Sequence, residues 1–395
     1  MSGSAVKKVL HLFASFDPGV ESERAVAAIN ALGRKVGHAV VSQDREARGA
    51  ARLVGGDIAL SWPRFPSLEG KPWPGRLKGI AAGMAGYDLV CTYGWGAIDA
   101  AMAHTLFADV FRLAPLVHHE FAPDLAELAT GGSFARRSYR RIAFGRSAAI
   151  VVGTREAERL ALETWQQPRT RVRLIPEGVG IGAFADTPPR DVLPSFIKRK
   201  GEAWIGSLAD GIDGDSLAQL VRALAALGEE WQVVMLGQVD ADLRENVLTL
   251  AEDLEVDHRL HFVGKVDVAG VIGLLDMLAL SRLPGDAAKI VVGAMAAGVP
   301  LVMPRAGEGW EQLAAMPSSD NGPYLYTAAP ADDGQPLQEQ ILTLAGDTPE
   351  RKRLGKANRA RAREHYDKEK LLSRQLALYR SLLGGKSAVS AEDRT

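Results

Sequence analysis

The sequence predicts an α/β protein with two doubly wound, Rossmann-like domains that face each other across a cleft and are followed by C-terminal helices. Three observations predict this fold. The 395 residues exceed what one hydrophobic core usually organises. Short apolar runs alternate with longer segments of helical period, a pattern typical of βα units on a parallel sheet. A segment with three prolines and a cationic cluster, residues 186–202, separates two such series.

The first half of the chain carries short apolar runs that we expect to be strands, with helices between them. Each run is rich in Val, Ile, Leu or Ala and is bounded by turn or polar residues. The predicted strands are Val9–Ala14, Ala39–Ser42, Ile58–Leu60, Asp88–Thr92, Ala114–His118 and Ala149–Val152.

A second series of the same kind follows residues 186–202, which we interpret as a linker. Its predicted strands are Ala203–Gly206, Gln232–Leu236, Arg259–Phe262, Met277–Leu280 and Pro300–Met303, with helices such as Asp215–Leu227 and Asp240–Leu254. Thr348–Leu383 has apolar residues at helical spacing and predicts one or two amphipathic helices. We expect an N-terminal domain over 1–185, the linker over 186–202, a C-terminal domain over 203–365, a final helix over 366–383 and a disordered tail over 384–395.

The composition argues against several classes of protein. A net charge of −1 gives no sign of a nucleic-acid partner. Cys91 is the single cysteine and lies in an apolar run, so we expect a buried strand thiol rather than a disulfide, a metal ligand or a nucleophile. The first apolar run is too short for a membrane span and lacks an export cleavage site, which predicts a cytoplasmic protein.

A glycine separates a predicted strand from a predicted helix in Phe16–Val26. Gly19 follows the strand, the helix is expected to start near Ser22, and Glu23 lies in its first turn. A glycine here lets a ligand approach the N–H groups at the helix N-terminus, which suits a phosphate or a sugar hydroxyl. The alternative is an ordinary glycine turn.

Polar and aromatic residues directly follow two further strands, in Thr92–His104 and Pro115–Phe121. His118, His119 and Glu120 are candidate catalytic residues, because imidazole or carboxylate at a strand end can position or deprotonate an acceptor hydroxyl. Neighbouring side chains of an extended strand point to opposite faces, so at most one of the two histidines is expected to face the cleft. The alternative is that they cap the strand and bind nearby backbone.

In these motifs the chain resembles glycosyltransferase family 4, the retaining GT-B enzymes of glycosyl transferases group 1. The resemblance covers nearly the whole length, and its stretches occur in the family's order. They are the glycine loop at Gly19, the H-x-E pattern that ends at Glu120, Ala148–Leu162, Arg171–Phe184 with Glu177 in place of an asparagine, His261–Val266 and Gly293–Val302. Several independent stretches in the correct order are hard to obtain by chance.

The resemblance implies a GT-B fold and a retaining, hexosyltransferase-like enzyme that needs no metal and no cofactor. Its donor would be a nucleoside diphosphate sugar, held mainly by the C-terminal domain. Its acceptor, a glycan or a lipid-linked molecule of envelope polysaccharide or glycolipid synthesis, would be held by the N-terminal domain.

The sequence departs from the family at the expected donor site. Ser207 stands where the family has an arginine, and Asp213 or a neighbour stands near a family lysine, although an aspartate repels a diphosphate. Gly285 and Gly293 occupy the positions of two family glutamates. Asp286 lies one residue out of register, so it either replaces the first glutamate or is an ordinary turn aspartate.

A cationic residue remains in this region. Lys289 lies just before the helix expected to begin near Ile290, where an ammonium and free helix N–H groups together suit a phosphate. The alternative is a solvated lysine at a helix start. Lys265 and Glu311 lie in comparable loops after strands, and Glu311 matches the last residue of a family turn. The full set of predicted donor contacts is Gly19, Gly206, Ser207, Lys265, Val266, Gly285, Asp286, Lys289, Ile290 and Glu311.

Five arginines cluster in the first half, four of them within residues 136–141 and the fifth at Arg146. On one helix they cannot all share a face, so part of the cluster must be solvated. The cluster predicts either a charged helix surface or a contact with an anionic membrane or a lipid-linked phosphate acceptor, which would place the protein at the inner face of the membrane.

Two functions remain open from the sequence. The first is an active glycosyltransferase with an altered donor pocket. The second is a GT-B-like protein without catalysis that binds or scaffolds in an envelope polysaccharide pathway, as the missing donor-site charges suggest. A nicotinamide-dependent enzyme is disfavoured, because no G-x-G-x-x-G follows a first strand with an acidic residue about 20 positions later.

Overall fold

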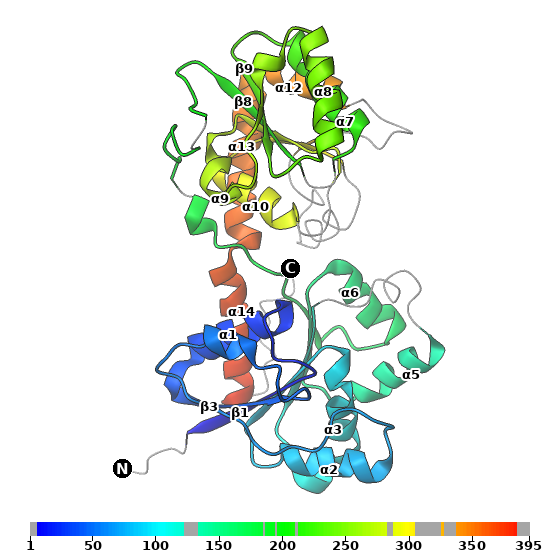
Figure 1. The fold of residues 1–395 in the computed structure, drawn as a ribbon. Helices are drawn as coiled ribbons and strands as arrows, with labels where there is room; N and C mark the ends of the chain where they lie inside the picture. Colours follow the sequence, from blue (N-terminus) through cyan, green and yellow to red (C-terminus); the bar gives the residue numbers. More distant parts are fainter. Residues whose placement is uncertain are drawn as a thin grey trace. The chain divides into compact units, whose positions relative to one another are not determined.

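The computed structural model describes residues 6–121, 133–184, 186–193, 196–209, 212–282, 287–304, 325–327 and 337–384. The chain forms two compact units (Figure 1). Unit 1 comprises Met1–Pro176 together with Lys370–Thr395, and unit 2 comprises Glu177–Glu369. The end of the chain therefore belongs to the same unit as its beginning.

Unit 1 is built on a parallel sheet whose described strands have the order β3-β2-β1-β4-β5-β6-β7. The order of connection reverses between β1 and β4. In such doubly wound sheets ligands bind outside the carboxyl ends of the strands at this switch point. The bounds are β1 Lys7–Phe13, β2 Val36–Ser42, β3 Leu60–Ser61, β4 Leu89–Tyr93, β5 Leu116–Glu120, β6 Ala149–Val152 and β7 Val172–Leu174.

Helices from both ends of the chain pack on this sheet. Their bounds are α1 Val20–Leu32, α2 Pro74–Met84, α3 Ile98–Phe111, α5 Phe134–Ala143, α6 Arg155–Arg159 and α14 Lys368–Leu383. Helix α3 contacts both α2 and α5. Helix α14, coloured red in Figure 1, places the fully buried Tyr379 against β5.

Unit 2 repeats the plan with a parallel sheet of strand order β10-β9-β8-β11-β12-β13, so its switch point lies between β8 and β11. Its strands are β8 Ala203–Leu208, β9 Trp231–Leu236, β10 Leu260–Phe262, β11 Met277–Ala279, β12 Leu301–Met303 and β13 Leu325–Thr327. Its helices are α7 Gly214–Ala226, α8 Ala241–Asp253, α9 Val268–Val271, α10 Ala287–Ala297, α12 Leu337–Gly346 and α13 Thr348–Arg361.

Aspartates begin several helices of unit 2. The carboxylates of Asp213, Asp240 and Asp347 accept backbone N–H groups in the first turns of α7, α8 and α13. A carboxylate in this position satisfies a donor that has no partner within the helix, and it also interacts favourably with the helix dipole. The sequence analysis identified Asp213 as a departure at the donor site. In the structure this residue caps the N-terminus of α7.

The two doubly wound sheets confirm the predicted fold class. Every predicted strand overlaps an observed one, while β7 and β13 were not predicted. The boundary between the units is marked by a short pairing within unit 2. The Val179 N–H donates to the carbonyl of Tyr366 at 2.7 Å, and the Lys368 N–H donates to the carbonyl of Val179 at 3.0 Å. The chain therefore enters and leaves unit 2 at adjacent positions.

Candidate functional site

The switch point of unit 1 brings the turns after β1 and β4 to the carboxyl edge of the sheet. Gly19 is exposed, and its extended backbone is one that any residue can adopt. A side chain there would meet no neighbouring atom, so the fold itself does not require glycine at this position. Gly94 differs, because its φ is 61° and a Cβ would overlap the carboxylate of Glu21. The left-handed φ favours glycine at position 94, and a larger residue would in addition require the Glu21 side chain to move.

Glu21 is a half-buried residue in the first turn of α1. Burial, followed by the charge of Glu120, raises its pKa from 4.5 to about 7. Within the described part of the chain the carboxyl makes no hydrogen bond or ion pair. The sequence argument chose Gly19 and Glu23 from this turn and missed Glu21. The signal that could have found it is a carboxylate two residues after the exposed glycine, at the start of the helix.

His118, on β5, is fully buried. Its Nδ1 lies 2.8 Å from the hydroxyl of Thr92, its Nε2 lies 3.5 Å from Oε2 of Glu120, and its ring packs against Phe144. Burial lowers its pKa, and this effect outweighs the opposing influence of the Glu120 carboxylate. The imidazole is therefore neutral at pH 7.

His119 is also fully buried, and its ring stacks on Tyr93. Its Nδ1 donates to the carbonyl of Thr92 at 3.3 Å, and its Nε2 accepts from the hydroxyl of Tyr379 at 2.7 Å. That hydroxyl in turn accepts from the amide of Gln375 at 3.0 Å. Burial lowers the pKa of His119 well below its usual range. The two histidines thus have different partners, and both belong to the core of unit 1.

Glu120, the last residue of β5, is held by a buried ion pair. Nη2 of Arg140 donates to its Oε2 at 2.8 Å, and both side chains are almost fully buried. Burial alone would raise the pKa of Glu120, but His118 and Arg140 together lower it below its ordinary value. Glu120 is therefore ionised near neutral pH, and its charge contributes to the raised pKa of Glu21.

The arginine cluster divides between the core and the surface, as expected. Arg140 lies over the ring of Trp165, and Arg136 lies 4.2 Å from the ring centre of Trp95. Arg137 and Arg141 lie on the outer side of α5. Arg146 lies beyond the end of α5 and forms an ion pair with Asp109.

The predicted donor residues of β8 lie inside unit 2. Ser207 is buried, and Gly206 packs under Leu275, whose side chain occupies the space that a Cβ would need. At the next turn Asp213 caps α7 through the N–H of Ser216, and its pKa is lowered first by that hydrogen bond.

Lys289 lies in the first turn of α10 and is exposed. Its Nζ forms a 2.8 Å ion pair with Oε1 of Glu177, the residue that replaces the family's asparagine. Ile290 follows it and is half-buried. Predicted donor residues Gly285, Asp286 and Glu311 lie outside the described residues.

Lys265 and Val266 follow β10, the edge strand of the sheet, and β9 and β8 separate them from β11. Lys265 is exposed and Val266 half-buried. The structure thus shows that Lys289, a predicted donor contact, is paired with Glu177, which was not among the predicted contacts.

Gly293, which occupies the position of a family glutamate, packs against an aromatic ring. A Cβ at this position would lie 2.7 Å from two ring atoms of Phe184. A glutamate at position 293 would therefore require the ring of Phe184 to move. The glycine at position 293 and the position of this ring are thus compatible with each other, and both lie within unit 2.

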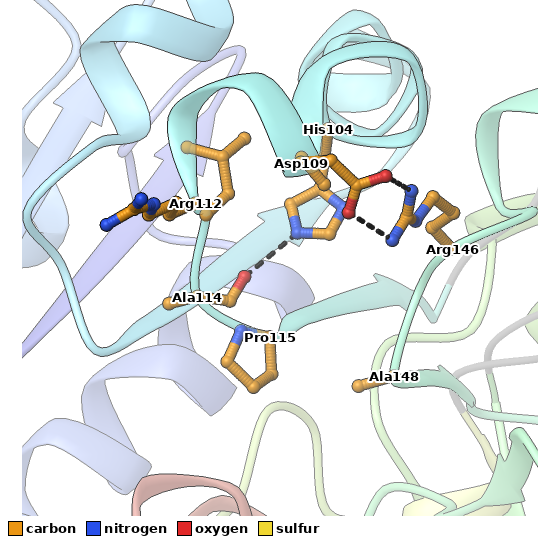
Figure 2. A pocket seen from close by; sticks show the side chains of 9 residues that line it. His104, Asp109, Arg112, Ala114, Pro115, Arg146 and Ala148 are labelled. Atoms are coloured by element: carbon orange, nitrogen blue, oxygen red, sulfur yellow. Dashed lines mark hydrogen bonds and ion pairs between the residues drawn. The ribbon is translucent and has the colours of Figure 1, made fainter.

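A pocket of about 530 Å³ lies at the opposite, amino edge of the unit 1 sheet. Figure 2 shows Nη1 and Nη2 of Arg146 bound to both oxygens of Asp109, at 2.5 and 2.7 Å, while Arg112 points away from this pair. Nε2 of His104 donates to the carbonyl of Ala114 at 2.9 Å. The charged side chains of this pocket thus either pair with each other or point away from each other. Doubly wound sheets bind ligands at the carboxyl ends of their strands, whereas this pocket lies at the amino ends.

No group of three or more His, Cys, Asp or Glu side chains in the described part of the chain is arranged to hold a metal ion. None of the helices there is long and apolar enough to cross a membrane.

Part of the chain is similar to a known protein family. Residues 202–347, in unit 2, match the family model of glycosyl transferases group 1. A search of curated proteins found no match.

Solved structures match both units. HepE from Anabaena in complex with UDP is 17% identical with a TM-score of 0.61, over 95% of this chain and all of that one. A glycosyltransferase from Rickettsia africae is 14% identical with a TM-score of 0.59, over 97% of this chain and all of that one. A UDP-N-acetylglucosamine 2-epimerase is 15% identical with a TM-score of 0.51, over 96% of both chains.

The chain has the GT-B fold of these proteins, with two Rossmann-like domains. At such low identity the likeness establishes the fold alone. The names of the similar structures include a transferase and an epimerase, so the reaction has to be argued from the sites.

Proposed function

We propose that the chain is a glycosyltransferase that moves a sugar from a nucleoside diphosphate sugar to a glycan or lipid-linked acceptor in envelope polysaccharide or glycolipid synthesis. The observation that carries the proposal is the match of residues 202–347 to group 1 glycosyl transferases. The similar HepE structure contains UDP, which supports a nucleoside diphosphate as the ligand. We expect transfer of a hexose with retention of configuration.

The donor is proposed to bind at the switch point of unit 2. A diphosphate leaving group needs cations or helix N-termini to stabilise its charge. Lys289 supplies an ammonium in the first turn of α10, and the Glu177 carboxylate now paired with it is exposed enough to be displaced. Ser207 and Lys265 are proposed as further contacts. The remaining members of the proposed set are Gly19, Gly206, Val266, Gly285, Asp286, Ile290 and Glu311.

His118, His119 and Glu120 are proposed to support the acceptor side. The two neutral imidazoles are held by protein groups, so they suit a role in fixing the end of β5 rather than in carrying a proton. Glu120 ends the strand, and its charge raises the pKa of Glu21. Its ionised carboxylate, fixed by Arg140, sets the electrostatic potential at the carboxyl edge of the sheet.

The outer faces of α3 and α5 are proposed to contact an anionic membrane that carries the acceptor. Phe134 and Ile142 of α5 are 78% and 53% exposed, and Val110 of α3 is 67% exposed. Arg137 and Arg141 lie on the same helix as Phe134 and Ile142. Apolar side chains between arginines suit the boundary between lipid headgroups and acyl chains. This contact would place the protein at the cytoplasmic face of a membrane.

Thermal-shift titration with a panel of nucleoside diphosphates and nucleotide sugars tests the donor site, because a ligand that binds the native state raises its stability. We expect saturable binding of one nucleotide, and loss of that binding in Lys289→Ala. Lys352→Ala removes an exposed lysine of α13 and is the matched control.

The outcome separates the two functions that the sequence left open. A nucleotide that binds the wild type and the control but not Lys289→Ala supports the transferase. The absence of binding by every nucleotide at millimolar concentration would contradict it and favour the GT-B-like binding or scaffolding protein.

A further inference from the structure

One tryptophan of unit 1 is exposed at the tip of a long loop. Trp73 is the last residue of the segment 62–73, which connects β3 to α2 and contains no helix or strand. Its side chain is 67% exposed, and within the described part of the chain the indole makes no hydrogen bond or ring contact. Tryptophan is on average a well-buried residue, and long connecting segments of this kind often carry function. Trp73 is therefore a candidate contact with a partner.

The body of this loop is anchored to neighbouring parts of unit 1. The N–H of Leu68 donates to Oε1 of Gln43 at 2.6 Å, and Nη2 of Arg76 donates to the carbonyl of Leu68. The ring of Phe65 packs on Gly83 of α2, where a Cβ would lie 2.8 Å from Cε2 of the ring. The loop therefore keeps its place without a ligand.

The backbone of the tip is restricted as well. Gly70 has a φ of 122°, which favours glycine, and Pro72 and Pro74 fix their own φ angles. A residue before proline is confined to extended conformations, and Trp73 has φ −66° and ψ 145°. The Trp73 N–H donates to the carbonyl of Lys71 at 2.8 Å. The indole is thus presented on a stiff backbone, so a partner can bind it at a small cost in conformational entropy.

The tip lies at the edge of unit 1 where doubly wound sheets bind ligands. Helix α2 leads into β4 and α3 follows it, so both helices begin at the carboxyl edge. Nη1 of Arg76 in the first turn of α2 donates to Oδ2 of Asp99 in the first turn of α3 at 2.6 Å. Packed helices lie about 8 to 10 Å apart. Trp73 therefore lies about one helix spacing from the turn between β4 and α3, which flanks the switch point.

The surroundings of Trp73 favour a neutral partner with a small contact area. Residues 69–75 are all exposed and contain one glutamate and one lysine, so the tip has no net charge. Anionic membranes attract clusters of about four or more Lys or Arg side chains. The other residues of the tip are glycines and prolines, which do not supply the area of about 800 Å² that a stable protein interface buries on each partner. One indole matches one sugar ring, which has C–H groups on its faces and hydroxyl groups at its edge.

We infer that Trp73 is a stacking platform for one sugar ring of a saccharide acceptor. The inference rests on the proposed function and deepens it, because the acceptor is then an oligosaccharide that extends from the switch point to the tip of the loop. The sugar ring lies against the face of the indole, and the indole N–H is available to donate to one of its hydroxyl groups.

Oligosaccharide binding to the full chain tests the platform without a nucleotide. The probes are maltohexaose, cellohexaose and chitohexaose, followed by saturation-transfer NMR and tryptophan fluorescence. We expect at least one to bind the wild type, and its affinity to fall about 10-fold in Trp73→Ala, because the apolar contact is lost. Trp73→Phe keeps an aromatic ring and should bind within about 3-fold of the wild type. Leu53→Ala changes another exposed apolar residue of unit 1, and this control should bind like the wild type.

Two outcomes would overturn the platform. The first is that no oligosaccharide binds, or that the wild type and Trp73→Ala bind equally well. The second comes from sedimentation with vesicles of phosphatidylcholine and phosphatidylglycerol. Vesicle binding that is lost in Trp73→Ala, in a protein that binds no oligosaccharide, would make the tip a membrane contact.

The nucleotide titration separates this inference from the proposed function. If nucleotides bind normally but oligosaccharide binding does not depend on Trp73, the platform is wrong and the transferase stands. If oligosaccharide binding depends on Trp73 while no nucleotide binds, the platform stands and the transferase is wrong.

Discussion

The carboxyl edges of the two units carry their charges in different ways. In unit 1, Glu120 and Arg140 form a buried ion pair beneath the edge, and the neutral His118 lies beside Glu120. In unit 2, the side chains of Lys289 and Glu177 are 60% and 38% exposed and meet on the surface. Buried charges depend on their partners, whereas exposed ions can exchange partners with water or ligand.

This difference indicates where each unit is rigid and where it is adaptable. The edge of unit 1 is fixed from below, so Glu21 is presented by a scaffold that does not need a ligand to form. The edge of unit 2 has an ion pair that an incoming anion can replace. The three predictions that follow would break or sharpen this contrast.

The largest effect is expected for Arg140→Met. The change leaves Glu120 buried without its cation, and removing one member of a buried ion pair typically costs about 3 to 5 kcal/mol of unfolding free energy. Urea unfolding of the full chain measures this loss. Arg141→Met, a change at an exposed residue of the same helix, should alter stability by less than about 0.5 kcal/mol. Equal stability of both variants would mean that unit 1 is not fixed by its buried charges.

An intermediate effect is expected for Glu21→Gln, and it depends on pH. The pKa of Glu21 rises from 4.5 in the unfolded chain to about 7 in the folded protein, so its contribution to stability is complete below pH 4.5 and is lost as pH rises through 7. At pH 8 the glutamine variant should therefore be more stable than the wild type by about 2 to 3 kcal/mol.

Buried histidines oppose this trend in both proteins, because their lowered pKa values make them lose stability as pH falls. The difference between variant and wild type isolates Glu21. Thermal or urea unfolding across about pH 4.5 to 8 measures it. A constant difference over this range would contradict the raised pKa.

The smallest effect on stability is expected for Glu177→Gln. Exposed ion pairs contribute about 0 to 1 kcal/mol, so unfolding should barely change. The variant frees Lys289, and nucleoside diphosphate binding should become a few-fold tighter at low salt. Calorimetry measures the affinity, and Glu202→Gln, a change elsewhere in unit 2, serves as control. Weaker binding in Glu177→Gln would show that the pair itself builds the site.

The sequence predicted the architecture because apolar runs and helical periods are local signals. It missed β7, where Arg171 and Arg173 flank and interrupt a three-residue edge strand. β13 is equally short. Such strands are specified by pairing with a neighbour and not by their own pattern.

The candidate site was harder to predict, since it depends on contacts between distant segments. The resemblance located β5, but it could not show that Tyr379, 260 positions away, binds His119. Glu21 was missed because its pKa depends on Glu120 and its space on Gly94, neither of which is near in sequence. Lys289 was proposed from its position before a helix, but its pairing with Glu177 could not be read from the sequence.

The position of helix α14 affects how the protein is made. Its Tyr379 and Gln375 complete the hydrogen bonds of His119, a residue in the middle of the first sheet. A growing chain has synthesised all of unit 2 before these two residues exist. Until they emerge from the ribosome, Nε2 of His119 lacks the hydroxyl that donates to it, and the first sheet lacks one of its covering helices. Unit 2 therefore has the opportunity to fold first, although it is encoded later.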